Sequence, residues 1–102
     1  MSKISKIIDF IERLTNPKYL KKIRFEVIEF EKEKFTEYDQ SIHWFLVHLV
    51  DQNILPQGVH YMGTYGKDEN KIVAYFDERR TKPENIENFL TSQGIKVKNI
   101  QS

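Results

Sequence analysis

Three histidines, His43, His48 and His60, are the residues of this sequence with the most versatile chemistry. A zinc or copper site needs three or four converging ligands. His43 and His48 are five positions apart, which is about 140° around a helix that turns about 100° per residue. They cannot converge on one ion, and His60 belongs to a different predicted element. Because the chain also has no cysteine, we predict no metal site.

Residue patterns typical of catalysis are also missing. Ser41 and His43 are close in sequence, but on a helix their side chains point to different sides and do not form a nucleophile–base pair. The sequence has no G-x-S-x-G motif, P-loop or dinucleotide-binding glycine pattern, and the Gly63–Gly66 pair is too loose to indicate one. We predict no catalytic residue and no cofactor. The alternative is a small enzyme whose site is assembled from distant residues.

A helix is predicted from a capping start at Thr36-x-x-Asp39, and the stretch Asn53–Gly58 ends it. Its inner face carries a regular apolar stripe: Ile42, Phe45, Leu46, Leu49 and Val50. The opposite side holds the candidate interface residues: Trp44, Val47, His48 and Asp51. An outward tryptophan needs cover, either from a neighbouring part of the chain or from a protein partner, because Trp is enriched among interface hot spots.

The most regular stretch is Lys71–Ile100, which predicts a strand, a helix and a second strand. Lys71–Phe76 alternates in side-chain direction as a strand does. Pro83 suits the first turn of a helix, and Gly94 suits the left-handed residue that follows a helix. Ile86, Phe89 and Leu90 form one apolar stripe between them.

Further elements precede this stretch. Residues 1–16 have the periodicity of an amphipathic helix, with apolar positions Ile4, Ile7, Ile8, Ile11 and Leu14. Lys21–Phe30 predicts a strand whose apolar parity switches, as at a bulge, a strand end or a strand buried on both faces. A charged connection follows. Val59–Gly66 and Lys71–Phe76 predict a hairpin, and Gly63 indicates a bulge or a close backbone approach.

The order of these elements predicts one α+β domain over residues 1–102. A β-α-β-β-α-β core over residues 21–100 is typical of the ferredoxin-like fold, a four-stranded antiparallel sheet with two helices on one face. The N-terminal helix is an addition to this core. The other sheet face would present Tyr61, Val73 and Tyr75. We therefore expect the N-terminal helix or a second subunit of a homodimer to cover that face.

Gly58–Ile100 resembles the second half of heavy-metal-associated domains, which are small ferredoxin-like metal chaperone modules. The resemblance covers 43 of 102 residues and rests on four stretches: Gly58-Val59, Val73-Ala-Tyr75 with Asp77, Thr81-x-Pro83-Glu84-x-Ile86, and Gly94-Ile95-x-Val97. That family binds soft metals through a Cys-x-x-Cys pair before its first helix. Here the corresponding loop, Lys34–Tyr38, has no cysteine. The resemblance therefore implies the topology and carries over no metal site.

Composition limits the classes of partner. Hydrophobic residues make up 39% and charged residues 30% of the chain, as in an ordinary globular domain. No apolar run approaches the roughly 20 residues that span a bilayer, so we expect no membrane partner. The absence of cysteine and of a pattern typical of a secretion signal predicts a cytoplasmic location. The net charge of +1 argues against a strong nucleic-acid binder.

Nucleic-acid binding nevertheless stays open as an alternative. Ferredoxin-like sheets can stack RNA bases on aromatic side chains, and this chain offers candidates for such contacts: Tyr65, Arg79, Arg80 and Lys82. The sequence favours a different function, a non-catalytic binding or regulatory module acting through protein contacts or a small ligand. A small inhibitor or adaptor of bacterial or phage origin would have these features. The expected partner is a second copy, another protein, or both.

Overall fold

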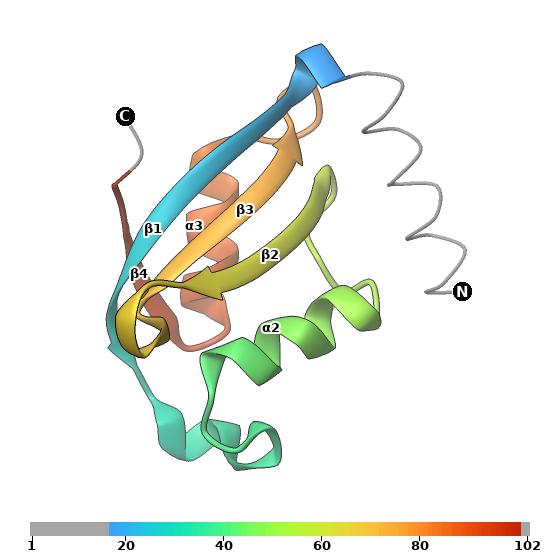
Figure 1. Ribbon diagram of the computed structural model, residues 1–102. Helices are drawn as coiled ribbons and strands as arrows, with labels where there is room; N and C mark the ends of the chain where they lie inside the picture. Colours follow the sequence, from blue (N-terminus) through green and yellow to red (C-terminus); the bar gives the residue numbers. More distant parts are fainter. Residues whose placement is uncertain (1–16, 101–102) are drawn as a thin grey trace.

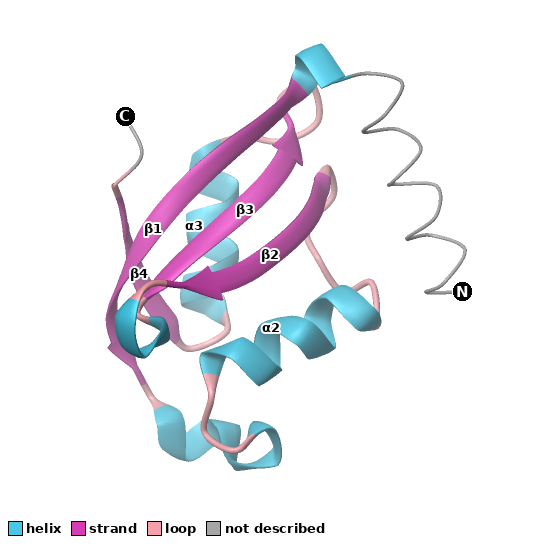
Figure 2. Ribbon diagram, in the orientation of Figure 1, coloured by secondary structure: helices cyan, strands magenta, loops and turns pink. Residues whose placement is uncertain are grey.

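The computed structural model describes residues 17–100 as an α+β fold built on a four-stranded antiparallel sheet (Figures 1 and 2). The strands are β1 (Leu20–Phe30), β2 (Val59–Tyr65), β3 (Lys71–Asp77) and β4 (Ile95–Asn99), and the helices are α2 (Ile42–Asp51) and α3 (Pro83–Ser92). Short 3-10 segments are η1 (Pro17–Tyr19), η2 (Lys32–Tyr38) and η3 (Lys67–Glu69). The strand order β2-β3-β1-β4 is compatible with a ferredoxin-like fold. The helix predicted for residues 1–16 lies outside the described residues.

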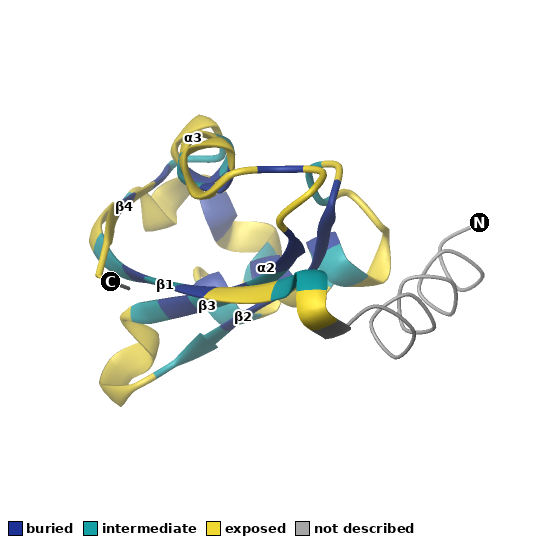
Figure 3. Ribbon diagram, turned by 90° about the horizontal axis from the view of Figure 1, so that it is seen from above, coloured by how far each residue is buried: buried dark blue, intermediate teal, exposed yellow. Residues whose placement is uncertain are grey.

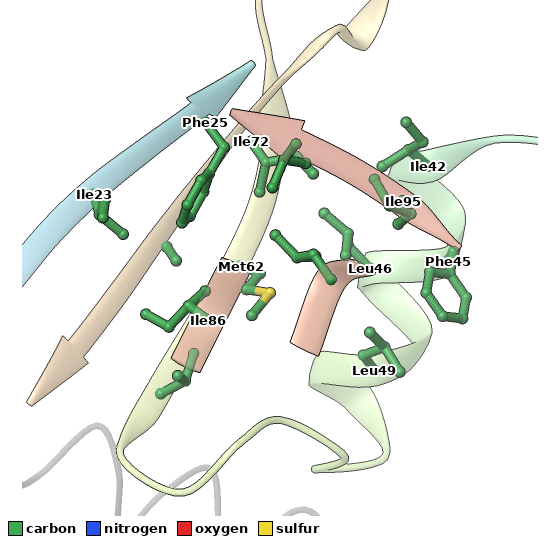
Figure 4. Close-up of a cluster of buried hydrophobic side chains, with 14 of the residues drawn as sticks. Ile23, Phe25, Ile42, Phe45, Leu46, Leu49, Met62, Ile72, Ile86 and Ile95 are labelled. Carbon is green, nitrogen blue, oxygen red and sulfur yellow. The ribbon is translucent and has the colours of Figure 1, made fainter. Parts of the chain in front are cut away.

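One sheet face and the two helices enclose the hydrophobic core. Figure 3 shows α3 on one side of the sheet, and Figure 4 shows side chains from strands and helices meeting there. The buried apolar residues of β1, β3 and β4 share one parity within each strand, as Phe25 and Ile72 illustrate. They meet Met62 of β2, Leu46 of α2 and Leu90 of α3. Burying such a side chain contributes about 1.5–3 kcal/mol to folding. The single core explains why both helices lie on the same face.

The predicted parity switch in the first strand is a β-bulge. The register between β1 and β4 shifts between Val27 and Glu29. The extra residue leaves Ile28 outside the core, with 57% of its surface exposed. A bulge lets one strand bend and re-aim its side chains, and here it lies within the part of β1 that pairs with β4.

The predicted capping start of the second helix at Thr36 is wrong. The preceding segment forms η2, with Phe35 buried in the core. Asp39 and Gln40 then have positive φ angles of 55° and 54°, which interrupt any helix. The helix begins after Ser41, whose hydroxyl accepts a hydrogen bond from the Trp44 N–H at 3.3 Å. The charged residues around Phe35 had indicated a connection without regular structure, so neither the 3-10 turns nor the burial of the Phe35 ring was predicted.

The residues that begin and end the last helix are as predicted. Pro83 occupies its first turn, and Gly94 follows it with φ of 93°. Ile86 and Leu90 are buried, whereas Phe89 is half-buried at the edge of the core. These residues pack α3 against β4, which is an edge strand of the described sheet.

Candidate interaction surface

A groove lies between α2 and β2, at one edge of the sheet. It has a volume of about 180 Å³ and is lined mostly by apolar side chains: His43, Leu46, Val47, Val50 and Asp51 of α2, and Tyr61, Met62 and Gly63 of β2. Its floor is core, because Leu46 and Met62 are buried. Its rims are open, because Val47 and Tyr61 are each 42% exposed. The groove therefore presents core-like chemistry to the outside.

Two of the predicted candidate sets meet at this groove. Val47 and Asp51 come from the outward side of α2, and Tyr61 comes from the sheet-face set. Trp44 lies beside them, 53% exposed, with its ring 4.9 Å from the ring of His43, which lines the groove. We call Trp44, Val47, Asp51 and Tyr61, with the groove between them, the α2–β2 surface.

His48 does not belong to this surface. Its ring lies 5.2 Å from the ring of Tyr38, and the side chain is half-buried there. Tyr38 in turn packs against Phe45 at 5.2 Å. His48 thus joins the aromatic cluster around η2, which is an intramolecular role.

The ring of Tyr61 lies over β2 in space that the absence of a side chain at Gly63 leaves free. A Cβ at Gly63 would lie 2.5 Å from the Tyr61 hydroxyl oxygen and 2.9 Å from its ring. Glycine at this position is therefore what allows the ring to lie along its own strand. The sequence predicted a bulge or a close backbone approach at Gly63, whereas the group that approaches it is the Tyr61 side chain. Tyr61 also meets Tyr75 on β3, with ring centroids 6.2 Å apart in an edge-to-face arrangement. The α2–β2 surface thus continues onto the sheet face that carries Tyr75 and Val73.

The two edge strands of the sheet differ in the charge of their side chains. Among the described strands, β2 and β4 are the edges. β4 has the sequence IKVKN, and its Lys96 and Lys98 are exposed. β2 has the sequence VHYMGTY, with no Asp, Glu, Lys, Arg or Pro. Lysine on a short edge strand is a common protection against pairing with another chain, and β2 has no such protection.

Asp77 and Arg79 form a clamp at the end of β3. The Arg79 guanidinium donates two hydrogen bonds to the Asp77 carboxylate at 2.9 and 2.6 Å, and its backbone N–H donates a third at 2.9 Å. The guanidinium also lies 4.0 Å from the ring centre of Tyr19. The side-chain hydrogen bonds from Arg79 lower the pKa of the buried Asp77 carboxyl to about 2. The clamp ties the start of β1 to the end of β3.

The residues proposed for nucleic-acid contact do not form one cluster. Arg79, Arg80 and Lys82 surround a depression at the start of α3 that also contains Glu78 and Glu84. Tyr65 pairs with Lys71 at the other end of the hairpin, about 20 Å away along a seven-residue strand.

Polar pairs elsewhere do not assemble a reactive centre. The Ser41 hydroxyl donates to the Glu69 carboxylate at 3.4 Å, whereas His43 Nδ1 lies 3.3 Å from the Thr64 hydroxyl. Within residues 17–100, no three His, Cys, Asp or Glu side chains gather in a way that could hold a metal ion. Neither α2 nor α3, the helices in that range, has the length and hydropathy of a membrane-spanning segment.

Comparison of the chain with models of known protein families, with curated proteins and with solved structures gives no match. The resemblance to heavy-metal-associated domains therefore stays a prediction.

Sequence reasoning missed the groove itself. Trp44, Val47 and Tyr61 could be identified separately as exposed apolar residues, but their proximity depends on how α2 packs against β2. The absence of charge from β2, in contrast to the lysines of β4, was visible in the sequence. It acquires meaning only when both strands are known to be edges.

Proposed function

We propose that the protein is a non-catalytic binding module that recognises a protein partner through the α2–β2 surface, and that one such partner is a second copy of the chain. The observation that carries this proposal is the apolar groove between α2 and an edge strand without charged residues. It is flanked by Trp44 and Tyr61, residue types that are enriched among interface hot spots.

Self-association fits this surface for two reasons. A twofold dimer uses the same patch on both copies, so a patch that is apolar and nearly free of charge can face itself without repulsion between like charges. The net charge of +1 adds little long-range repulsion between copies. Asp51 is the exception at the rim of the groove.

The test is sedimentation velocity of the purified protein over a concentration series. We expect wild type to form a reversible dimer and Trp44→Ala to weaken it by about 30-fold, equivalent to about 2 kcal/mol for a hot-spot residue. Ile28→Ala is the matched control, because Ile28 is equally exposed and lies on β1 rather than at the groove. Wild type that stays monomeric at the highest concentration, or equal weakening by both variants, would contradict the proposal.

The fold and location follow the same reasoning. The strand order supports a ferredoxin-like fold. The N-terminal helix proposed for residues 1–16 rests on the apolar periodicity of the sequence alone. The lack of cysteine fits a cytoplasmic location.

Binding of single-stranded nucleic acid is a second candidate, and one observation favours it. The edge-to-face pair of Tyr61 and Tyr75 lies on the sheet face opposite α2 and α3, and the register places Lys22 of β1 opposite Tyr75. Aromatic rings beside a cation are typical of platforms for stacked bases. Fluorescence anisotropy with labelled oligo(U) and oligo(dT) at two salt concentrations tests this function. Salt-dependent binding that Tyr75→Ala weakens supports it, and no binding at low salt removes it.

A further inference from the structure

We propose that the groove of the α2–β2 surface receives the Trp44 ring of a second copy of the chain, and that two copies exchange these rings reciprocally across a twofold axis. This inference rests on the proposed function, because it names the contact that holds the dimer together. Each groove is then incomplete in a single copy, since the other copy supplies the side chain that fills it.

The groove has room for one large ring. Its volume is about 180 Å³, and its lining runs along α2 from His43 to Asp51 and across the middle of β2. An apolar cavity of about 150 Å³ holds a benzene molecule, so the groove can hold one aromatic side chain but not a helix. Leu46 and Met62 form a buried apolar floor on which such a ring can pack.

Trp44 of the same copy does not fill this space. Its ring packs edge to face against the ring of His43 at 4.9 Å, it does not line the groove, and it is 53% exposed. Helical side chains lean toward the N-terminus of their own helix, whereas the groove continues in the opposite direction to Val50 and Asp51. Each copy therefore presents an exposed ring beside a groove of matching size that this ring does not enter.

The order of residues along α2 suits an antiparallel pair of helices. Trp44, Val47 and Asp51 are spaced i, i+3 and i+7, so they form one stripe on the outward side of α2. Val47 is at the middle of this stripe and is 42% exposed. A twofold axis at Val47 sets two α2 helices antiparallel and brings Trp44 of each copy opposite Val50 of the other.

The polar groups at the two ends of α2 are complementary in this arrangement. The rings of His43 and Trp44 carry N–H donors at the start of the helix, and the Asp51 carboxylate is an acceptor at its end. Antiparallel helices place the donors opposite the acceptor, whereas parallel helices in register would place Asp51 against Asp51. A buried indole N–H usually finds an acceptor, and Asp51 of the second copy offers one at the rim of the groove.

Intrinsic fluorescence provides the first test, because Trp44 is the only tryptophan of the chain. As the concentration of wild type rises through the Kd of the dimer, the emission maximum should move to shorter wavelength. Quenching by acrylamide should decrease at the same time, because the ring leaves water. An emission maximum and a quenching constant that stay unchanged while sedimentation shows a dimer would overturn this inference and leave the proposed function standing.

Mixing two variants tests whether the ring enters the groove of the other copy. Trp44→Ala lacks the ring and keeps the groove, whereas Val50→Phe fills the groove and keeps the ring. Neither variant can form the contact with itself, but a mixed dimer keeps one of the two contacts. Because the loss of both contacts should weaken the dimer about 30-fold, we expect the mixed dimer to have a Kd about fivefold lower than either homodimer. Native mass spectrometry resolves the three dimers by mass.

Trp44→Ala mixed with Ile28→Phe is the matched control. Ile28 lies on β1 and is 57% exposed, so Ile28→Phe keeps both ring and groove, and its homodimer should be tighter than the mixed dimer. Circular dichroism and urea unfolding of each variant alone check its fold. Val47→Phe, at an exposed position of the groove lining, replaces Val50→Phe if that variant does not fold.

The other outcomes separate this inference from the proposed function. A mixed dimer no tighter than the Trp44→Ala and Val50→Phe homodimers would overturn the exchange of rings, even where wild type dimerises. Wild type that stays monomeric at the highest concentration would reject the proposed function and this inference together.

Discussion

Strands β2 and β4 are the two edge strands of the described sheet, but they present different side chains to a binding partner. β4 is five residues long, and its two exposed lysines, Lys96 and Lys98, alternate with the buried Ile95 and Val97. Any strand added there would have to desolvate those ammonium groups, which is costly. β2 is longer, has no charged side chain and borders an apolar groove. An edge that lacks protection is a place where binding is permitted.

The comparison teaches that the protein protects its surface selectively. If association were only a general tendency of exposed apolar residues, Ile28 would matter as much as Trp44, because both are about half exposed. The account instead confines binding to the α2–β2 surface and predicts that β4 and the outer side of β1 are inert.

Placing on β2 the kind of charge that protects β4 should produce the largest effect. Tyr61→Lys puts an ammonium group at the rim of the groove, and we expect dimer formation to weaken by at least about 30-fold. The free energy of unfolding should change little, because Tyr61 is 42% exposed. Sedimentation velocity and urea unfolding measure the two quantities. Ile28→Lys is the control, and an equal loss of association in that variant would break the comparison.

The Asp77–Arg79 clamp provides a stability effect that should leave binding intact. We expect Asp77→Asn to lower the free energy of unfolding by about 2 kcal/mol at neutral pH, with dimerisation of the folded protein unchanged. The folded pKa of about 2 lies below the ordinary value of 3.8. The contribution is therefore fully present above about pH 4 and is lost as the pH falls toward 2.

Urea unfolding of wild type and Asp77→Asn at neutral pH and near pH 2.5 measures this contribution. The difference between the two proteins should shrink at the lower pH. A difference that does not depend on pH would show that the carboxylate charge is not what holds the clamp.

A smaller effect should come from Gly63. In Gly63→Ala the new methyl group would lie 2.5 Å from the Tyr61 hydroxyl oxygen, so the tyrosine ring must move off β2. We expect dimer formation to weaken by about threefold to tenfold, equivalent to about 1 kcal/mol. Thermal unfolding should be nearly unchanged, because the ring can swing toward solvent. Unaltered dimerisation would mean that the position of the Tyr61 ring does not contribute to the contact.

The smallest effect is expected from removing the protection of β4. The double variant Lys96→Thr, Lys98→Thr keeps β-forming residues but deletes both charges. Light scattering over a concentration series should detect slight additional association that persists when Tyr61→Lys is added. If the double variant behaves as wild type, the short length of β4 rather than its lysines protects that edge.

Sequence reasoning located most of the fold because local patterns dominated it. The alternation in Lys71–Phe76, the proline at position 83 and the glycine at position 94 each specify backbone geometry without help from distant residues. The predicted start of the second helix was wrong because Asp39 and Gln40 adopt left-handed backbone angles after η2, so that α2 begins only after them. Neither residue type requires that conformation.

The candidate surface could be predicted only in pieces. The outward side of a helix can be read from its period, so Trp44 and Val47 were identified, but His48 at the boundary turned out to pack on Tyr38. The groove depends on the packing of α2 against β2, which no local pattern encodes. The role of Arg79 was also hidden, because the ring of Tyr19, on which its guanidinium stacks, is distant in sequence and meets it only in the folded sheet.

Amide hydrogen exchange of the wild-type protein at low and high concentration tests the central claim most directly. Self-association through the α2–β2 surface predicts slower exchange in Val59–Tyr65 and the adjacent part of α2 as concentration rises, while Ile95–Asn99 stays unchanged. Protection that increases in β4 instead, or in neither edge strand, would contradict the account.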